Sequence, residues 1–412
     1  MSKVFELSLG IMTAVGGFVD IGEVVFATDA GARYGLNHLW TIPVGVILIV
    51  VYSEMAGRVA SVTGKPVFVL IRDRFGFTVG LCSLVASNIL NVLTCAAEIG
   101  GVAFVLRLIS GMSYGVAVSV AVLVVMAITW VLPFSKIEKV FGFGGLAMLV
   151  FVVAAVASGP NWGTVASSFV PHVPRLAGTS DALNYAFYAV GLIGATVMPY
   201  EVYFYSSGTI EDGRKPAELY INTITTVLGF TLGSILTVAL IVLGATTFLP
   251  NGVVPNLVGS SAIGAMLPFG QLGILLAAVG LFFAIAGASI ETSFAGAYNL
   301  AQFFGWPWGK HKNPLKVPRF TLGWVFALVI ALAVLTTGID PVQVTEYAVI
   351  LSIVVLPVTY LPILLVANDR AVMGEHANAS WQKALGWSCL VVITLVGLAA
   401  VPLMYLTHSG QG

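Results

Sequence analysis

Charged residues are scarce in this chain of 412 residues: only 9% are Asp, Glu, Lys or Arg, whereas soluble domains carry about 25%. Hydrophobic residues make up 58%. The 18 basic and 18 acidic residues cancel, so the chain lacks the basic excess of a protein that binds nucleic acid. This composition argues against a soluble enzyme and indicates an integral membrane protein.

Cysteine is also rare, and the three residues Cys82, Cys95 and Cys389 lie far apart in apolar stretches. They form no CxxC pair, no metal-ligand spacing and no disulfide framework. We find no nucleotide-binding loop, no nucleophile elbow and no histidine cluster, and we expect the five histidines to lie on solvated surfaces. We therefore expect neither an enzyme nor a bound cofactor. The first apolar stretch has no A-x-A site before Asp20, so we expect no cleaved signal peptide.

Long apolar runs, in contrast, are abundant. A membrane span needs about 20 mostly apolar residues, and the sequence contains eleven such runs in a single domain, 1–412. They are expected at about 10–30, 39–57, 79–106, 115–133, 140–158, 184–208, 219–248, 264–304, 320–337, 343–367 and 384–406.

The basic residues of the loops predict how these spans are oriented, because Lys and Arg concentrate on the cytoplasmic side. With a cytoplasmic N-terminus, fifteen of the 18 basic residues lie inside, and only Arg33, Arg107 and Arg175 lie outside. An odd number of spans then places the C-terminus outside. We expect a multi-pass protein of the cell membrane, embedded in the bilayer, that works as a monomer.

Several acids fall in or at the ends of the apolar runs. They are Asp20, Glu23, Glu54, Glu98, Glu201, Glu291 and Glu346. A charge at the bilayer centre costs at least about 2.5–3.5 kcal/mol, and no Lys or Arg lies deep in the runs to offset it. Such carboxyls are explained by a cation that they bind or a proton that they carry; for a single acid, a neutral carboxyl hydrogen-bonded to a neighbouring helix is an equal alternative.

Two of the runs are interrupted beside acids. The first contains Gly16, Gly17 and Gly22 around Asp20, and glycine is a poor helix former. The sixth contains Pro199, which cannot donate a backbone hydrogen bond. Freed carbonyls at membrane depth are tolerated where they are buried or line a cavity. Both segments are predicted to be discontinuous helices.

The interruptions occupy equivalent places, at the first helix of two five-helix halves. Repeat one covers about 10–158 and repeat two about 184–367, and an extra helix follows at about 384–406. A shift of 178 residues places Glu23 on Glu201 and Gly16 on Gly194. Because five is odd, the halves have opposite orientations, which is the inverted-repeat pattern of secondary transporters with a site between the repeats.

An ordered set of motifs resembles the NRAMP divalent-metal transporters over nearly the whole chain. The motifs are Asp20-Ile21-Gly22-Glu23 with Ala30-Gly31, Gly35 and Leu39-Trp40, then Thr63-Gly64-Lys65, Arg72-Asp73-Arg74-Phe75, Ala97-Glu98-Ile99-Gly100, Gly194-Ala195-Thr196-Val197-Met198-Pro199 and Asp369-Arg370-Ala371-Val372-Met373-Gly374. The resemblance implies an all-α LeuT-type fold, in which helices 1–5 and 6–10 are inverted repeats and helices 1 and 6 are discontinuous.

The resemblance also implies a metal site. In the family, an Asp and an Asn of the first helix and a Met and a backbone carbonyl of an Ala in the sixth hold the metal. Asp20, Ala195 and Met198 match, whereas Glu23 replaces the Asn. Two acids this close do not both ionise cheaply without a cation between them, so we expect metal binding to expel a shared proton.

Other positions depart from the family. Ile21 replaces a Pro, Tyr200 and Tyr205 replace histidines, and Glu201 replaces an Asn. Val349 and Val355 replace glutamines. Cys95 replaces an Asp of the proton route, although Glu98 remains. Tyrosine, with a pKa near 10, is a poor proton carrier at neutral pH. The replacements make proton coupling doubtful and leave Tyr200, Glu201, Glu98, Tyr205 and Cys95 as candidates for a substrate or proton path.

The sequence thus predicts a secondary transporter that imports a divalent cation by alternating access. A thioether ligand favours Mn²⁺ or Fe²⁺, whereas the added carboxylate leaves Mg²⁺ open. A competing interpretation is that Met198 binds no metal and only packs against neighbouring side chains. The alternative function is transport of a small organic solute, held by Tyr200, Tyr203 and Tyr205.

Overall fold

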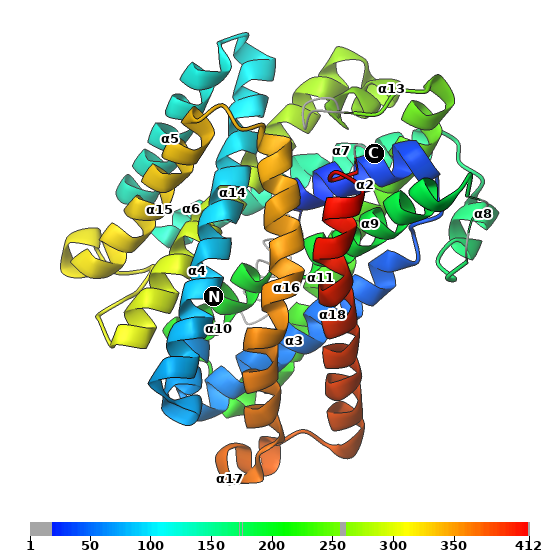
Figure 1. Cartoon of the computed structure of the whole chain (residues 1–412). Coiled ribbons are helices and arrows are strands. Elements are labelled where there is room, and N and C mark those ends of the chain that lie inside the picture. The colour runs from blue at the N-terminus through cyan, green and yellow to red at the C-terminus, as the bar shows by residue number, and fades with distance from the viewer. Residues whose placement is uncertain (1–18, 173, 175, 256–260, 411–412) are drawn as a thin grey trace.

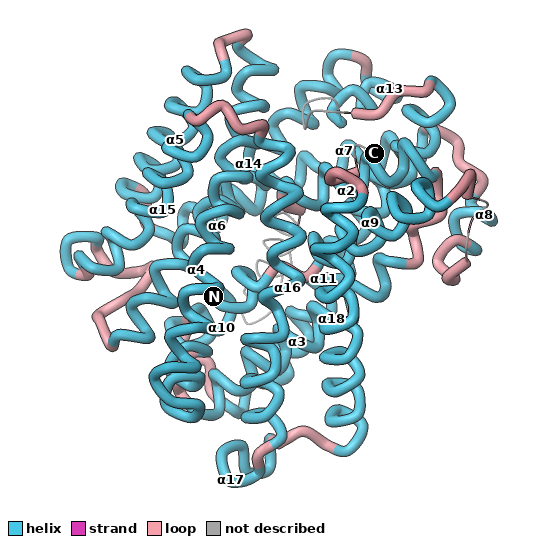
Figure 2. The backbone as a smooth tube through the Cα atoms, in the orientation of Figure 1, coloured by secondary structure: helices cyan, strands magenta, loops and turns pink. Residues whose placement is uncertain are grey.

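The structure, a computed structural model, describes residues 19–172, 174, 176–255 and 261–410. The described residues form helices joined by loops, without a strand (Figure 2). Ten helical stretches of this part are long and apolar enough to cross a membrane. The first predicted span begins among residues 1–18, outside the described residues, and its second half is the helix α2. The prediction of an all-helical membrane protein is confirmed.

The first repeat consists of α2 to α7, and the helix α8 lies on the connection to the second repeat. The bounds are α2 (Ile21–Tyr34), α3 (Thr41–Thr63), α4 (Val67–Ser110), α5 (Tyr114–Val131), α6 (Phe134–Gly145), α7 (Leu149–Ala157) and α8 (Trp162–Ser167). A 3₁₀ turn joins α6 to α7, so these two helices form one span.

The second repeat and the extra helix follow. Their bounds are α9 (Thr179–Thr196), α10 (Pro199–Glu211), α11 (Leu219–Leu243), α13 (Met266–Phe269), α14 (Gln271–Phe304), α15 (Pro318–Thr336), α16 (Pro341–Asn368), α17 (Arg370–Met373) and α18 (Ser380–Leu406). A π-helical turn, Gly244–Phe248, continues α11. The predicted eighth span, 264–304, is divided at Gly270, whose φ of 56° requires glycine.

The longest helices form the centre of the bundle. The helix α4 packs along α14 and also contacts α16, and α16 stands beside α18 (Figure 1). Much of α18 faces outward, as shown by Leu395 and Leu398, which are 62% and 70% exposed. Exposed leucines on a helix at the edge of a membrane bundle contact lipid rather than water. The core therefore lies between the two repeats, where α2, α9 and α10 are buried.

Small residues bring α2 into direct contact with α11. A methyl group at Gly31 would lie 2.3 Å from the carbonyl oxygen of Ile241, and one at Gly244 would lie 2.6 Å from the carbonyl oxygen of Thr28. Close backbone approach at small residues is the common way in which membrane helices associate. This contact fixes α2, and with it Asp20, against the second repeat.

We predict that Gly31→Ala destabilises the protein, because the new methyl group meets a backbone atom that has no room to shift alone. Overpacking of this kind costs about 1–3 kcal/mol, measured as a lower midpoint of thermal unfolding in detergent. The matched control is Gly115→Ala, since a methyl group there meets nothing within 4 Å. That variant should be neutral or stabilised by up to about 1 kcal/mol. Equal behaviour of the two variants would contradict the packing argument.

Candidate functional site

The interruption predicted in the first span lies partly outside the described residues, whose first helix, α2, is capped by Asp20. The backbone of Asp20 is extended, with φ −92° and ψ 179°, and its side chain accepts a hydrogen bond from the backbone N–H of Glu23. The bond is 2.9 Å long and uses Oδ1. The other oxygen, Oδ2, is buried and has no hydrogen-bond partner among the described residues. Asp20 is thus a helix cap that keeps one carboxylate oxygen available at the positive end of the α2 dipole.

The second broken helix is interrupted between α9 and α10. Val197 leaves the helical region, with φ −118° and ψ 66°, and α10 restarts at Pro199. In an unbroken helix the carbonyl of residue 195 accepts from the amide of residue 199. Because residue 199 is proline, the carbonyl of Ala195 loses that donor. The break thereby frees a backbone oxygen where the sequence predicted one.

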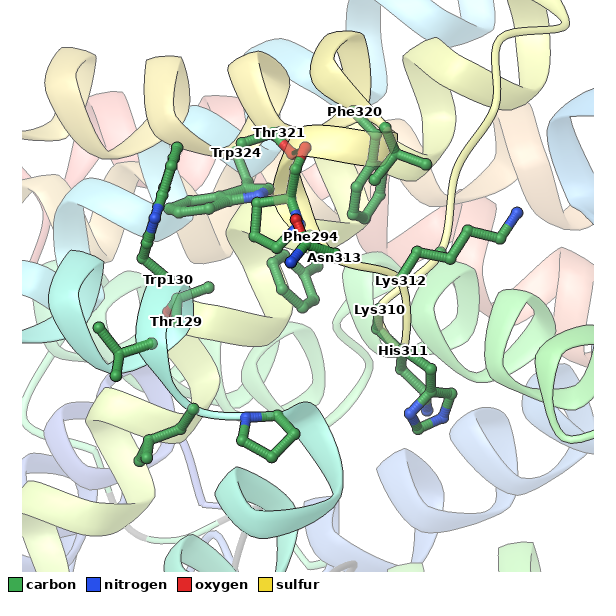
Figure 3. A pocket seen from close by; sticks show the side chains of 16 residues that line it. Thr129, Trp130, Phe294, Lys310, His311, Lys312, Asn313, Phe320, Thr321 and Trp324 are labelled. Atoms are coloured by element: carbon green, nitrogen blue, oxygen red, sulfur yellow. Dashed lines mark hydrogen bonds between the residues drawn. The ribbon is translucent and has the colours of Figure 1, made fainter.

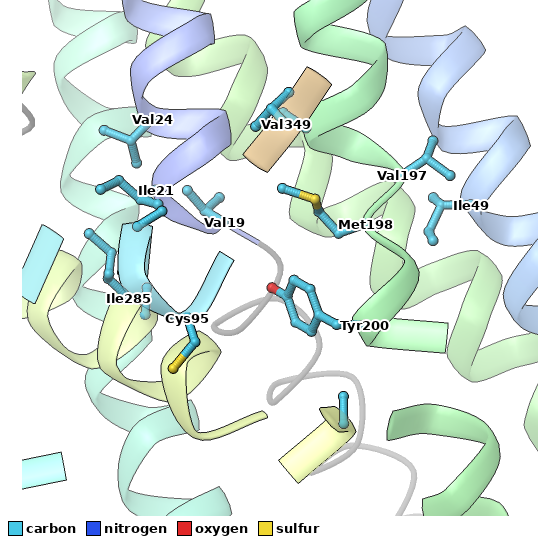
Figure 4. Packing of buried hydrophobic residues seen from close by; sticks show 14 of the residues in the cluster. Val19, Ile21, Val24, Ile49, Cys95, Val197, Met198, Tyr200, Ile285 and Val349 are labelled. Carbon is cyan, nitrogen blue, oxygen red and sulfur yellow. The ribbon is translucent and has the colours of Figure 1, made fainter. Parts of the chain in front are cut away.

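The start of α2 and the break between α9 and α10 meet at Gly22. A Cβ atom placed on Gly22 would lie 3.1 Å from Asp20 Oδ1, 3.5 Å from Met198 Cε and 2.7 Å from Val349 Cγ2. Figure 4 shows Met198 and Val349 near the start of α2. Met198 is buried, with 2% exposure. The structure therefore brings the carboxylate of Asp20 and the thioether of Met198 to the same small region, with Val349 as an apolar wall.

Glu23 lies beside this region but is held by hydroxyl groups. Its Oε1 accepts from Thr196 Oγ1 at 3.3 Å, and its Oε2 accepts from Thr237 Oγ1 at 2.9 Å. The first threonine ends α9 and the second lies in α11, so this carboxyl joins α2 to two helices of the other repeat. Thr196 and Thr237 were not predicted, because a threonine in an apolar helix gives no sequence signal.

Glu98 reaches the same place from α4. Its Oε1 accepts from the backbone N–H of Ile21 at 3.4 Å, and its Oε2 is buried with no partner in the described part of the chain. Cys95, one turn earlier, is buried with its thiol 4.0 Å from the carbonyl of Ser289. Glu98 is thus connected to the first turn of α2, whereas Cys95 is an apolar neighbour.

Two candidate residues of α10 are also buried and unpaired. The hydroxyl of Tyr200 and the Oε2 atom of Glu201 have no hydrogen-bond partner within the ranges that the structure describes. Tyr200 lies close to Met198 (Figure 4). Neither Glu201 nor the acids Asp20, Glu23 and Glu98 form an ion pair with a described Lys or Arg. Four carboxyl groups around two helix ends, without a basic partner in the described part of the chain, favour a bound cation or bound protons.

The tyrosines proposed to hold an organic solute do not face one cavity. Tyr203 contacts Ser87 and Thr359, each at 3.0 Å. Tyr205 instead donates to Asn222 Oδ1 at 2.7 Å. Tyr205 is therefore turned toward α11, and the structure does not place it with Met198.

Glu54 and His38 differ from the sequence-based expectation. Glu54 was counted among the unpaired acids, but it forms an ion pair with Arg58 at 2.9 Å. His38 was expected on a solvated surface, but it is fully buried, and its ring nitrogen lies 2.9 Å from the carbonyl oxygen of Tyr185. Burial lowers the pKa of His38 to about 4, so this residue is neutral at physiological pH.

Glu346 is buried as well, but it belongs to another group of charges. Its electrostatic neighbours are Asp29, Arg33 and Asp340. None of these residues contacts Met198 or Asp20 in the interactions described above. Glu346 is thus set apart from the helix breaks.

A helix that begins at the buried Asp20, a second one broken before Pro199, and buried carboxyls between them are the arrangement of a membrane transporter of the LeuT-type fold. The solved structures agree with this architecture. A crystal structure of a mutant of the Eremococcus coleocola manganese transporter matches with a TM-score of 0.75 at 21% identity, covering 95% of this chain and 85% of that one. Mhp1, a nucleobase-cation-symport-1 family transporter, matches with a TM-score of 0.61 at 13% identity, covering 98% and 92%.

The chain belongs to the Nramp family. Residues 10–402 match the family model described as natural resistance-associated macrophage protein-like. A curated relative, the divalent metal cation transporter MntH of Latilactobacillus sakei subsp. sakei, is 26% identical over 94% of this chain and 87% of its own length. Members of this family are transporters and not enzymes, and they carry metal as a substrate rather than a cofactor.

Proposed function

We propose that the protein is a secondary transporter that imports a divalent metal cation, which binds between the two broken helices. The observation that carries this proposal is the approach of the Asp20 carboxylate to Met198 at Gly22. The second oxygen of this carboxylate, Oδ2, is buried without a hydrogen-bond partner among the described residues. Ala195 supplies the carbonyl that Pro199 leaves without a donor. Carboxylate, thioether and carbonyl together suit a transition metal better than Ca²⁺ or hydrated Mg²⁺.

Glu23 completes the proposed ligand set. Its oxygens accept hydroxyl donors from Thr196 and Thr237, and each carboxylate oxygen keeps further lone pairs for a cation. The hydroxyl groups orient the carboxylate as outer-shell partners orient metal ligands elsewhere. The relatives support this reading, because one is named a divalent metal cation transporter and a solved neighbour is a manganese transporter.

Alternating access follows from the broken helices. Half-helices that end at the site can tilt separately, so that it opens first to one side of the membrane and then to the other. We place the N-terminus in the cytoplasm from the bias of the basic residues. Glu98, Glu201 and Tyr200 would line the path beside the metal. Cys95 removes one acid from that path, so we infer transport driven by the cation gradient and the membrane potential.

The proposal is tested by metal uptake into proteoliposomes. Purified protein is reconstituted, and the entry of Mn²⁺, Fe²⁺ or Mg²⁺ is followed with a fluorescent chelator inside the vesicles. Uptake of at least one of these ions above protein-free vesicles is expected. If none enters under an inward gradient with a negative interior potential, divalent-cation transport is refuted.

Met198→Ala tests the ligand that decides selectivity. If the thioether binds the metal, the variant should lose Mn²⁺ and Cd²⁺ uptake by about 10–100-fold and Mg²⁺ uptake much less, because soft ligands favour transition metals. The comparison is made as initial rates of the three ions in the same vesicles. Equal losses for all three ions would show that Met198 only packs against α2.

A further inference from the structure

A cavity lies at one end of the bundle, and none of its lining residues belongs to the region around Gly22. It has a volume of about 220 Å³ between the end of α5, the loop that follows α14 and the start of α15. Figure 3 shows aromatic rings on one side and basic side chains on the other. The principal residues on these two sides are Trp130, Phe294, Phe320 and Trp324, and Lys310, His311 and Lys312.

The basic side of the cavity is only partly compensated by acids. Lys310 interacts electrostatically with Glu291, and His311 pairs with Asp212 at 3.9 Å, whereas Lys312 forms no ion pair with a described acid. The ammonium group of Lys310 also lies 4.7 Å from the centre of the Phe134 ring. Lys312 is exposed, and its charge is free to meet an anion. This end of the cavity is therefore suited to a phosphate or another compact anion.

The aromatic side continues into surface that suits hydrocarbon. Trp130 is 45% exposed and Val131, which also lines the cavity, is 74% exposed. Leu315 on the loop and Leu322 on α15 are 77% and 66% exposed. Tryptophans are enriched where membrane meets water, with basic residues at the cytoplasmic side. A soluble anion would leave this apolar surface unused, whereas a phospholipid would cover it.

The loop that forms the basic side is held in place by hydrogen bonds within the loop and to the helices α10 and α15. Thr321 Oγ1 donates to the carbonyl of Pro314 at 2.7 Å, and the backbone N–H of Leu315 donates to Asn313 Oδ1 at 2.9 Å. The backbone N–H of Lys310 donates to Glu211 Oε2 at 3.2 Å. Because the loop is already ordered, binding a ligand costs little conformational entropy there. Such preorganisation favours binding.

We propose that this cavity binds the headgroup of an anionic phospholipid from the leaflet at this end of the bundle, the cytoplasmic leaflet in the predicted orientation. The phosphate lies at Lys312 and His311, and an acyl chain follows Trp130 and Val131. The cavity is smaller than the roughly 300–1,000 Å³ of drug-sized ligand sites, so it takes a headgroup rather than a whole lipid. Basic pockets between membrane helices are the usual sites for such headgroups.

Fluorescence quenching by brominated lipid tests the position of the acyl chain. The full-length protein is placed in mixed micelles with phosphatidylglycerol or phosphatidylcholine whose chains carry bromine. We expect brominated phosphatidylglycerol to quench tryptophan emission at least about twofold more strongly. Trp130→Phe should remove this difference, whereas Trp381→Phe should keep it, because Trp381 is 67% exposed on α18 and lies outside the cavity. Equal quenching by the two lipids would overturn the proposal.

Binding measurements test the headgroup. Lys312→Gln should weaken the affinity for phosphatidylglycerol by about fivefold, the effect of one basic residue near an anionic surface. Lys215→Gln, an exposed lysine outside the cavity, should leave it unchanged. Equal losses in both variants would indicate only general surface charge and would overturn the proposal. Displacement of the lipid by millimolar inorganic phosphate would identify a site for soluble anions and would overturn the lipid assignment. Neither readout depends on metal transport, so this proposal and the proposed function fail separately.

Discussion

Asp20→Ala is expected to reduce Mn²⁺ uptake by at least about 100-fold, because it removes the carboxylate that lies beside Met198 at Gly22. Loss of an outer-shell partner already costs about 10–100-fold in metal affinity or activity, and a charged ligand should cost more. Initial rates in proteoliposomes with a chelator inside measure the effect. An uptake rate within about threefold of wild type would show that Asp20 does not bind the metal.

Asp20→Asn separates the two roles of this residue. Alanine removes the helix cap as well as the charge, and the lost cap alone costs about 1 kcal/mol of stability. Asparagine keeps the cap and removes the charge, so it should fold like wild type and still fail to transport. Glu375→Gln is the matched control, since the side chain of Glu375 is 88% exposed. Normal uptake by Asp20→Asn would assign Asp20 a structural role only.

A membrane potential of −100 mV is expected to concentrate the metal more than a thousandfold inside vesicles without a proton gradient. One charge crossing 100 mV gains about 2.3 kcal/mol, so a divalent cation gains about 4.6 kcal/mol, and about 1.4 kcal/mol is tenfold. Internal metal is measured at fixed potassium diffusion potentials. Accumulation should follow the voltage, with the internal pH unchanged.

Acidification of the vesicle interior by metal entry, at clamped voltage, would contradict uncoupled transport. Glu98 and Glu23 are the acids to examine in that case. Glu23 belongs to the first turn of α2, and Glu98 of α4 accepts a hydrogen bond from that turn. Loss of the acidification signal in Glu98→Gln, with metal uptake retained, would identify Glu98 as the proton carrier. Loss in Glu23→Gln instead would indicate that the metal expels a proton from the binding site itself.

The described spans and the helix break before Pro199 were predictable from the sequence, because each follows from local chemistry. The break predicted in the first span lies partly outside the described residues. Runs of about 20 apolar residues define spans, and Pro199 removes a specific backbone donor. Two further features were also readable but were missed. Glu54 and Arg58 are four residues apart on one helix face. Tyr203 and Tyr205 are rotated by roughly 300° and 140° from Tyr200 at about 100° per residue, so these rings diverge.

The contacts between the repeats were not predictable. Thr237 donates to Glu23 across 214 positions of the chain, and a threonine in a helix more often bonds to its own backbone. The approach of Met198 to Gly22 likewise depends on how α2 and α10 pack, which a single sequence does not specify. Burial of His38 depends on Tyr185, which comes from the other repeat.

The most direct measurement of the central claim is the position of the metal itself. A crystal grown with Mn²⁺ and recorded at a wavelength where manganese scatters anomalously should show one strong peak between the carboxylate of Asp20 and the sulfur of Met198, within reach of the carbonyl of Ala195. The peak should vanish in Asp20→Asn. A peak at another place in the protein, with none between these two side chains, would contradict the account.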